Sequence, residues 1–192
     1  MGVPVIDTGP ITVEEFYAFT DGQPDEEKWE LIGGELVLNA APSPRHQWIV
    51  KNVVFALTTW ERELRAPWAV LPGLGVRVSD TDRPEPDVLV IPAKFRSLDQ
   101  QERDTSDVIV AFEILSPSTK GRDLRWKRAA YTGLPSLTDY IVIAQDAVEV
   151  VVFARDSGFA EHRMRSIDDV IELRSLGIVL PVAEIYRETG LV

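Results

Sequence analysis

Short apolar runs, too short for ordinary helices, recur along the middle and the second half of this 192-residue chain. They cover residues 69–70, 75–78, 87–91, 110–115, 138–144 and 148–154, and residues 159–165 form a further candidate. Runs of this length bounded by turn residues are typical of strands, and those with few polar positions suit the centre of a sheet. The chain is therefore predicted to build a sheet of several strands.

Other segments have the periodicity or the end signals of helices. Thr12 followed by Glu15 has the spacing of a capping box, which predicts a short helix over residues 13–19. A long amphipathic helix is predicted over residues 45–65, with Ser43 as its cap and Pro44 at a tolerated first position. Two further helices are predicted over residues 122–132 and 181–188.

The apolar runs around Gly33 and Gly34 indicate a tight hairpin over residues 29–38, and the polar residues 94–107 indicate a loop. This order predicts an α/β (α+β) fold: a mixed central sheet flanked by helices, with an N-terminal helix and β-hairpin. No repeat or long linker divides the chain, so residues 1–192 are expected to form one domain. Residues 1–40 carry the N-terminal helix and hairpin, and residues 41–192 carry the core and the C-terminal strands.

Composition narrows the chemistry. The chain has no cysteine and two histidines, which excludes disulfides, thiolate zinc sites and a cysteine nucleophile. A metal site would use mainly Asp and Glu oxygens, which suit Mg²⁺ or Mn²⁺. The formal charge of −11 argues against general, sequence-independent binding of nucleic acid, although a local basic patch can outweigh distant acids. No apolar run is long enough for a membrane span, and we expect a cytoplasmic protein.

Two acids interrupt the apolar pattern of the strands. Asp87 opens one run, and Glu113 lies within another, where it shares a face with Ala111 and Leu115. A carboxylate in an apolar strand is costly unless it is compensated. Asp87 can be a strand-initiating residue after Pro86, and Glu113 can pair with a nearby arginine. If the two strands are neighbours, the carboxylates instead converge, and a divalent cation between them would relieve their repulsion.

The segment after Glu113 is strongly basic. Five cations between residues 120 and 128 face the single acid Asp123, a net +4 in a chain of −11, and the expected phosphate-binding residues are Lys120, Arg122 and Arg125. On a helix, Asp123, Lys127 and Tyr131 share a face. An Asp–Lys pair at this spacing is commonly a solvated surface contact. Next to two strand acids, however, a lysine matches metal-dependent phosphodiester hydrolysis.

At these residues the chain resembles the Uma-type family of restriction-endonuclease-like proteins in the PD-(D/E)XK nuclease superfamily. The resemblance rests on the order of "WELIGGELV", a following Pro and His46, "PEPDVLV", "FEILSPST", Lys127 and Tyr131, and "DYIVI". It implies a restriction-endonuclease-like core and a Mg²⁺-dependent or Mn²⁺-dependent DNA endonuclease. The superfamily pattern has Lys two residues after the second acid, where this chain has Leu115, and Lys127 resembles the relocated lysine of the family.

The resemblance also implies roles for individual residues. Asp87, Glu113 and Lys127 would be catalytic, and Asp87, Glu113 and the carbonyl of Ile114 would hold the metal. The supporting candidates are Glu35, His46, Asp123 and Tyr131. DNA would be the substrate, and a homodimer is expected because nucleases of this type often need two active sites to cut two strands. Two alternatives stay open: a nuclease-like fold that serves as a binding or interaction module, and a hydrolase of a smaller phosphoester.

Overall fold

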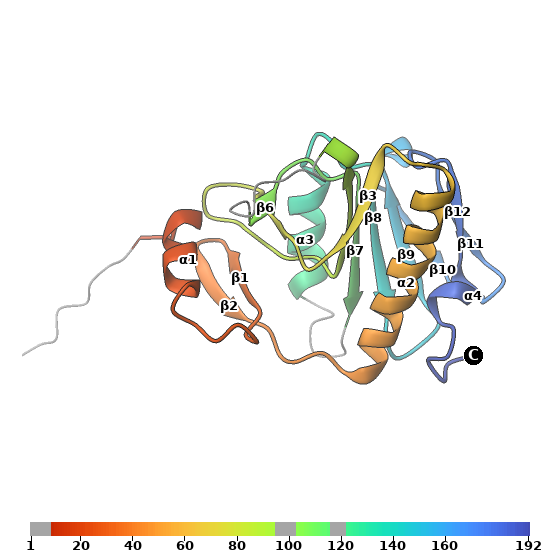
Figure 1. Cartoon of the computed structure of the whole chain (residues 1–192), viewed down its shortest axis with the longest axis horizontal. Coiled ribbons are helices and arrows are strands. Elements are labelled where there is room, and N and C mark those ends of the chain that lie inside the picture. Colours follow the sequence, from red (N-terminus) through yellow and green to blue (C-terminus); the bar gives the residue numbers. More distant parts are fainter. Residues whose placement is uncertain (1–8, 95–102, 116–121) are drawn as a thin grey trace, which may run out of the picture.

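The computed structural model describes residues 9–94, 103–115 and 122–192, so the predicted phosphate contact Lys120 lies outside the described residues. Figure 1 shows an N-terminal lobe beside a larger body built around a sheet. The lobe contains α1 (Val13–Thr20), β1 (Trp29–Ile32) and β2 (Glu35–Leu38). The predicted capping box at Thr12 and Glu15 is confirmed. Gly33 and Gly34 both have positive φ angles, of 60° and 75°, which glycine adopts without steric cost.

The central sheet has six strands in the order β10-β9-β8-β7-β5-β3. Their bounds are β3 (Trp68–Pro72), β5 (Val88–Pro92), β7 (Val110–Leu115), β8 (Asp139–Ala144), β9 (Val150–Ala154) and β10 (Glu161–Met164). Within this sheet β7 and β8 are parallel, and the other neighbouring pairs are antiparallel. The sheet is therefore mixed, as the sequence predicts. Because β5 and β7 are antiparallel neighbours, the start of β5 and the end of β7 lie at the same edge.

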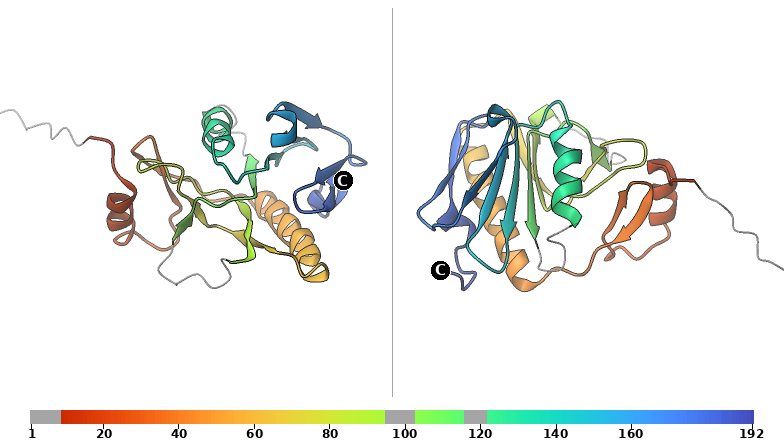
Figure 2. Two further views of the ribbon diagram at one scale, coloured as in Figure 1. Left: turned by 90° about the horizontal axis from the view of Figure 1, so that it is seen from above. Right: turned by 180° about the vertical axis from the view of Figure 1, so that it is seen from behind.

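The two faces of the sheet are covered by different elements (Figure 2). One face packs against α2 (Pro44–Glu63), α4 (Val182–Ile185) and a hairpin of β11 (Val170–Leu173) and β12 (Ile178–Pro181). The other face packs against α3 (Arg122–Thr132). Alternation along β7 divides the core, since Phe112 and Ile114 belong to the α2 side, whereas Ala111 and Leu115 belong to the α3 side. Glu113 therefore points toward α3.

The structure confirms most of the predicted elements and adds three strands. The helices begin and end within two residues of their predicted bounds, except that α4 covers only the middle of residues 181–188. The β11–β12 hairpin was not predicted, because its strands are only four residues long and three of their eight residues are exposed. The loop over residues 94–107 contains the two-residue strand β6 (Asp104–Thr105), which pairs with β4 (Gly75–Val76). A 3₁₀ turn, Arg155–Ser157, follows β9. Among the described residues, no helix is long and apolar enough to cross a membrane.

Candidate active site

A cavity of about 520 Å³ lies at the sheet edge where β5 begins and β7 ends. We call it the acidic cavity. Its lining comes from the N-terminal lobe, from the first turn of α2, from β7 and from α3. Its lining includes six ionisable side chains: Lys28, Glu30, His46, Asp87, Glu113 and Lys127. Residues far apart in the sequence therefore meet because two strands and two helices end or begin at one edge.

Asp87 lies immediately before β5 and is held by three contacts. Its Oδ2 accepts a hydrogen bond of 2.8 Å from the backbone N–H of Ile114, which fixes the carboxylate against the end of β7. Its Oδ1 lies 3.1 Å from Nε2 of His46 and 3.6 Å from Nζ of Lys28. Burial opposes the charged form, but the contacts with His46, Lys28 and Ile114 outweigh it and lower the pKa of Asp87. Asp87 is therefore an anchored, ionised carboxylate, not merely a strand-initiating residue.

Glu113 is buried, and its partners come from α3. Its Oε1 lies 3.0 Å from Nζ of Lys127 and accepts a hydrogen bond of 3.1 Å from the hydroxyl of Tyr131. Lys127 and Tyr131 are four residues apart, and both reach the same oxygen, which confirms that they share a helix face. The cationic partner of Glu113 is thus Lys127, and not one of the nearby arginines that the sequence also allowed. Oε2 of Glu113 receives no hydrogen bond from the described residues.

Glu30, on β1, was not among the residues predicted for the site. It is 2% exposed, and its Oε1 lies 3.0 Å from Nζ of Lys127 and accepts a 2.6 Å hydrogen bond from the backbone N–H of Glu85. Asn39 donates a 3.1 Å hydrogen bond to Oε2. Glu30 interrupts the apolar run W-E-L-I in the same way as Glu113 interrupts β7. An acid within an apolar strand is therefore the sequence signal that could have identified Glu30.

The cavity contains more buried acids than buried cations. Burial raises the pKa of Glu113 to about 7, since the attraction of Lys127 is offset by repulsion from Asp87 and Glu30. Burial disfavours the charged form of Lys127, yet Glu113 and Glu30 together raise its pKa above the usual range. Burial raises the pKa of Glu30, but Lys127, the backbone N–H of Glu85 and the side chain of Asn39 together lower it below its usual value. One buried ammonium is thus shared between two acids, with Asp87 as a third acid nearby.

The other predicted residues are placed as follows. His46, in the first turn of α2, lines the acidic cavity beside Asp87. Glu35, on β2, is exposed and is not part of the cavity lining. Arg125 is exposed on α3. Arg122 and Asp123 belong to the first turn of α3, and their side chains lie outside the described part of the structure.

A divalent cation fits the donor chemistry of this cavity. In the described ranges, no group of three or more His, Asp or Glu side chains is arranged to enclose a metal ion. The available donors are the carboxylates of Asp87 and Glu113, including the unbonded Oε2, and the backbone carbonyl of Ile114. Mg²⁺ is commonly held by one or two carboxylates while it keeps several waters. Burial is the main cause of the raised pKa of Glu113, and the repulsion from Asp87 and Glu30 that adds to it would be relieved by a bound cation.

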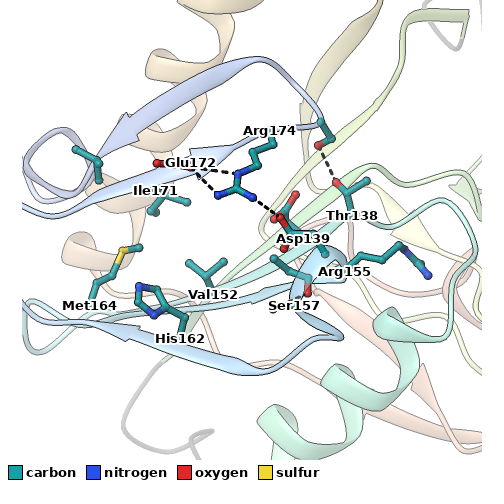
Figure 3. A pocket seen from close by; sticks show the side chains of 14 residues that line it. Thr138, Asp139, Val152, Arg155, Ser157, His162, Met164, Ile171, Glu172 and Arg174 are labelled. Atoms are coloured by element: carbon teal, nitrogen blue, oxygen red, sulfur yellow. Dashed lines mark hydrogen bonds and ion pairs between the residues drawn. The ribbon is translucent and has the colours of Figure 1, made fainter.

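A second hollow, the hairpin cleft, lies between β9–β10 and β11 (Figure 3). Its volume is about 610 Å³, and Val152, Met164 and Ile171 form an apolar floor. Arg174 at the rim is 74% exposed and pairs with Glu172 and Asp156. The cleft is thus larger than the acidic cavity, but its ion pairs are solvated, and such pairs contribute little.

The mixed sheet, the helices on both faces and the acidic edge define a nuclease-like α/β fold. The fold is shared with the crystal structure of "a putative nuclease belonging to DUF820" from Anabaena variabilis, with a TM-score of 0.75 and 17% sequence identity. That similarity covers 92% of this chain and 98% of the other.

The chain belongs to the Uma2 family, described as "Putative restriction endonuclease", whose model matches residues 13–183. It is also 31% identical over 94 residues to "Uncharacterized protein slr1290" of Synechocystis. This match covers 46% of the present chain, and the chain spans about half the length of that curated relative.

Proposed function

We propose that this protein is a divalent-metal-dependent phosphodiester hydrolase that acts as a DNA endonuclease. One observation carries the proposal: Asp87, Glu113 and Lys127, which lie on three different elements, converge within one cavity and are largely buried there. Structural ion pairs do not require an open cavity beside them. Perturbed charged groups lining a cavity are typical of functional sites.

Asp87, Glu113 and the carbonyl of Ile114 are the proposed ligands of Mg²⁺ or Mn²⁺. When bound, the cation would polarise a phosphate oxygen and make a water molecule a better nucleophile. Asp87 suits this role because the N–H of Ile114 fixes one of its oxygens toward the end of β7. Glu113 suits it because Tyr131 and Lys127 hold Oε1, so that Oε2 remains for the ion.

Lys127 is the proposed catalytic cation. Leu115 occupies the position where the superfamily has its lysine, but Nζ of Lys127 reaches Glu113 from α3 at 3.0 Å. An ammonium there would orient the attacking water or offset the negative charge that develops on the phosphate. Glu30 would position this ammonium, because its Oε1 also lies 3.0 Å from Nζ. His46 and Lys28 would orient Asp87 in the same way.

DNA is the proposed substrate because the family description names a restriction endonuclease. The exposed Arg125, together with Lys120 and Arg122, would contact phosphates near the cavity. A homodimer that brings two acidic cavities to the two strands, and action in the cytoplasm, belong to the same proposal.

The test is cleavage of plasmid DNA with Mg²⁺ or Mn²⁺ by the parent protein and by two variants. Asp87→Asn and Glu113→Gln should each lower the rate of cleavage by about 100-fold or more, because each variant lacks one carboxylate ligand of the metal ion that would stabilise the transition state. Glu172→Gln, which changes an exposed acid of the hairpin cleft, should cut like the parent. Circular dichroism must show that all proteins are folded. Cleavage at the parental rate by both site variants would refute the site.

One observation favours a second function. Lys127 already supplies both Glu30 and Glu113 with a counter-charge, so the cavity has a stable arrangement without a metal ion. The protein would then be a nuclease-fold binding module. Calorimetry that detects no binding of Mg²⁺ or Mn²⁺ at millimolar concentrations, together with no cleavage of any nucleic acid, would favour this function over hydrolysis.

A further inference from the structure

The solvent side of α2 carries large aromatic side chains that the core does not use. Trp48, Lys51, Phe55 and Arg62 are all exposed, and we call them the α2 outer face. Their spacing of three, four and seven residues places them on one side of a helix. Phe55 is 70% exposed, the most of any large hydrophobic side chain that the structure describes, and Trp48 is 38% exposed. These aromatic rings are therefore available to a partner.

The exposure of these rings is not a consequence of core packing. Ile49, Val53 and Leu57 face the sheet from the opposite side of the same helix and are fully buried. In Figure 2 (left), α2 lies at the periphery of the molecule, on the other side of the sheet from α3. Since α2 has a complete apolar face without Trp48 and Phe55, the two rings contribute little to folding. Exposed aromatic residues grouped in this way mark interaction surfaces.

The charge of the α2 outer face is opposite to that of the chain. Nζ of Lys51 lies 3.8 Å from the centre of the Trp48 ring, and Arg62 continues the row toward the C-terminal end of the helix. Glu61, an acid of the same helix, is turned away, since it accepts a hydrogen bond from the N–H of Val70. In a chain of formal charge −11, this face combines cations with aromatic rings.

The same helix begins at the acidic cavity. His46, in its first turn, contacts Asp87, whereas Trp48, two residues later, lies on a different side of the helix. Gln47, between them, is exposed and also lines the cavity, so it connects the cavity with the side of the helix that carries Trp48. At about 1.5 Å per residue, Phe55 lies about 10 Å further along the helix than Trp48. This distance is about three base steps of a stacked strand, which rises about 3.4 Å per nucleotide. A strand leaving the cavity can therefore follow the helix.

We propose that the α2 outer face binds single-stranded DNA next to the acidic cavity. Trp48 and Phe55 stack on unpaired bases, Lys51 contacts a phosphate between them, and Arg62 contacts a phosphate beyond Phe55. Aromatic platforms with interleaved cations are the common means of holding single strands. A duplex keeps the faces of its bases stacked inside, so it engages only the cations. The proposal rests on the proposed function, because it assigns a path to the same substrate.

The test measures the binding of a fluorescently labelled oligonucleotide of mixed sequence, single-stranded or annealed, by anisotropy in EDTA. Without metal, the result does not depend on cleavage. Trp48→Ala and Phe55→Ala should each weaken single-strand binding by about fivefold or more, since one stacked base contributes about 1 kcal/mol or more. Duplex binding should change little. Lys51→Ala should reduce the salt dependence of single-strand binding by about 0.7 in the log–log slope.

Three variants serve as controls. Phe55→Tyr keeps an aromatic ring and should bind like the parent, whereas Phe55→Leu keeps only apolar area and should bind like Phe55→Ala. Leu64→Ala changes a residue at the end of the same helix that is 50% exposed and should have no effect. Equal single-strand binding by the parent, Trp48→Ala and Phe55→Ala would overturn the proposal. So would a parent that binds no single strand.

Light scattering separates DNA from a second copy of the chain as the occupant. If Trp48→Ala or Phe55→Ala converts a dimer into a monomer, the face is a subunit interface and the proposal is wrong. Failure of the proposed function looks different. In that case Asp87→Asn cuts like the parent, or nothing cuts, while the two aromatic variants still weaken single-strand binding.

Discussion

The acidic cavity and the hairpin cleft are hollows of similar volume, but the ion pairs of the first are buried and those of the second are exposed to solvent. In the acidic cavity, Glu30, Glu113 and Lys127 are each less than a tenth exposed, and Nζ of Lys127 lies 3.0 Å from Oε1 of each acid. In the hairpin cleft, Arg174 meets Glu172 and Asp156 with comparable distances, but all three side chains are more than half exposed. Solvent weakens the second set of contacts and not the first.

This difference shows that cavity size does not identify the candidate active site. The hairpin cleft is the larger hollow, yet its apolar floor and solvated rim require no special function. The acidic cavity keeps three carboxylates near one buried ammonium, an arrangement that is expensive to desolvate. Such a group of charges beside an open cavity is typical of functional sites. The following predictions test whether the two hollows differ in this way.

Removal of the central ammonium should have the largest effect on stability. Lys127→Met leaves Glu30 and Glu113 buried without their shared counter-charge, so we expect the free energy of unfolding to fall by about 3–5 kcal/mol. Urea unfolding measures this change. Arg174→Met, the corresponding change in the hairpin cleft, should leave the unfolding midpoint unaltered, because its ion pairs are exposed. Equal effects of the two substitutions would contradict the comparison.

Loss of one hydrogen bond to a buried carboxylate should have an intermediate effect. Tyr131→Phe removes the hydroxyl that donates to Oε1 of Glu113, and we expect a loss of about 1–3 kcal/mol in urea unfolding. Tyr186 is equally buried, but its hydroxyl contacts the neutral carbonyls of Ala144 and Glu149 and accepts a hydrogen bond from the N–H of Glu149. Tyr186→Phe therefore measures the loss of neutral hydrogen bonds at a buried hydroxyl. No measurable loss for Tyr131→Phe would mean that its hydroxyl does not stabilise the carboxylate of Glu113.

The smallest effect concerns Asp139, the buried acid of the hairpin cleft. Burial raises the pKa of Asp139, although hydrogen bonds from Thr138 and Ser175 act against it. An acid with a raised pKa in the folded state contributes stability at low pH that is lost as the pH rises through that pKa. Asp139→Asn should therefore stabilise the protein slightly at pH 7 and not at pH 3.5, as measured by the urea midpoint. A destabilised variant at pH 7 would mean that the ionised carboxylate has a favourable partner.

Much of the candidate site was predictable from local sequence. Asp87, Glu113, Lys127 and His46 were identified as residues that break an apolar pattern or stand in the pattern of a family, and the structure brings all four to one cavity. Glu30 was not identified, although it breaks an apolar run in the same way. The family resemblance implies a supporting role for Glu35, but Glu35 is exposed on β2 and does not line the cavity. A shift of one residue in the pairing of a hairpin would move every side chain to the other face of the strands. The short apolar run around Gly33 and Gly34 does not define which face is buried.

The β11–β12 hairpin could not be predicted for a related reason. Its alternation between buried and exposed residues covers only four positions per strand. Short runs of this kind are ambiguous until another surface selects one side of them. Here the apolar side chains Ile171 and Leu180 are buried against the core that α2 and the sheet form.

The sequence by itself determined the order of the elements, the mixed sheet and the residues with unusual chemistry. These properties depend on periodicity, caps and turns, which act over a few residues. Only the tertiary structure decided which charges meet. Lys127 lies between Glu113 and Glu30, 14 and 97 residues away in the chain, because strand pairing and helix packing bring their elements to one edge. Coulomb interactions depend on distance and burial, and neither is encoded in local sequence.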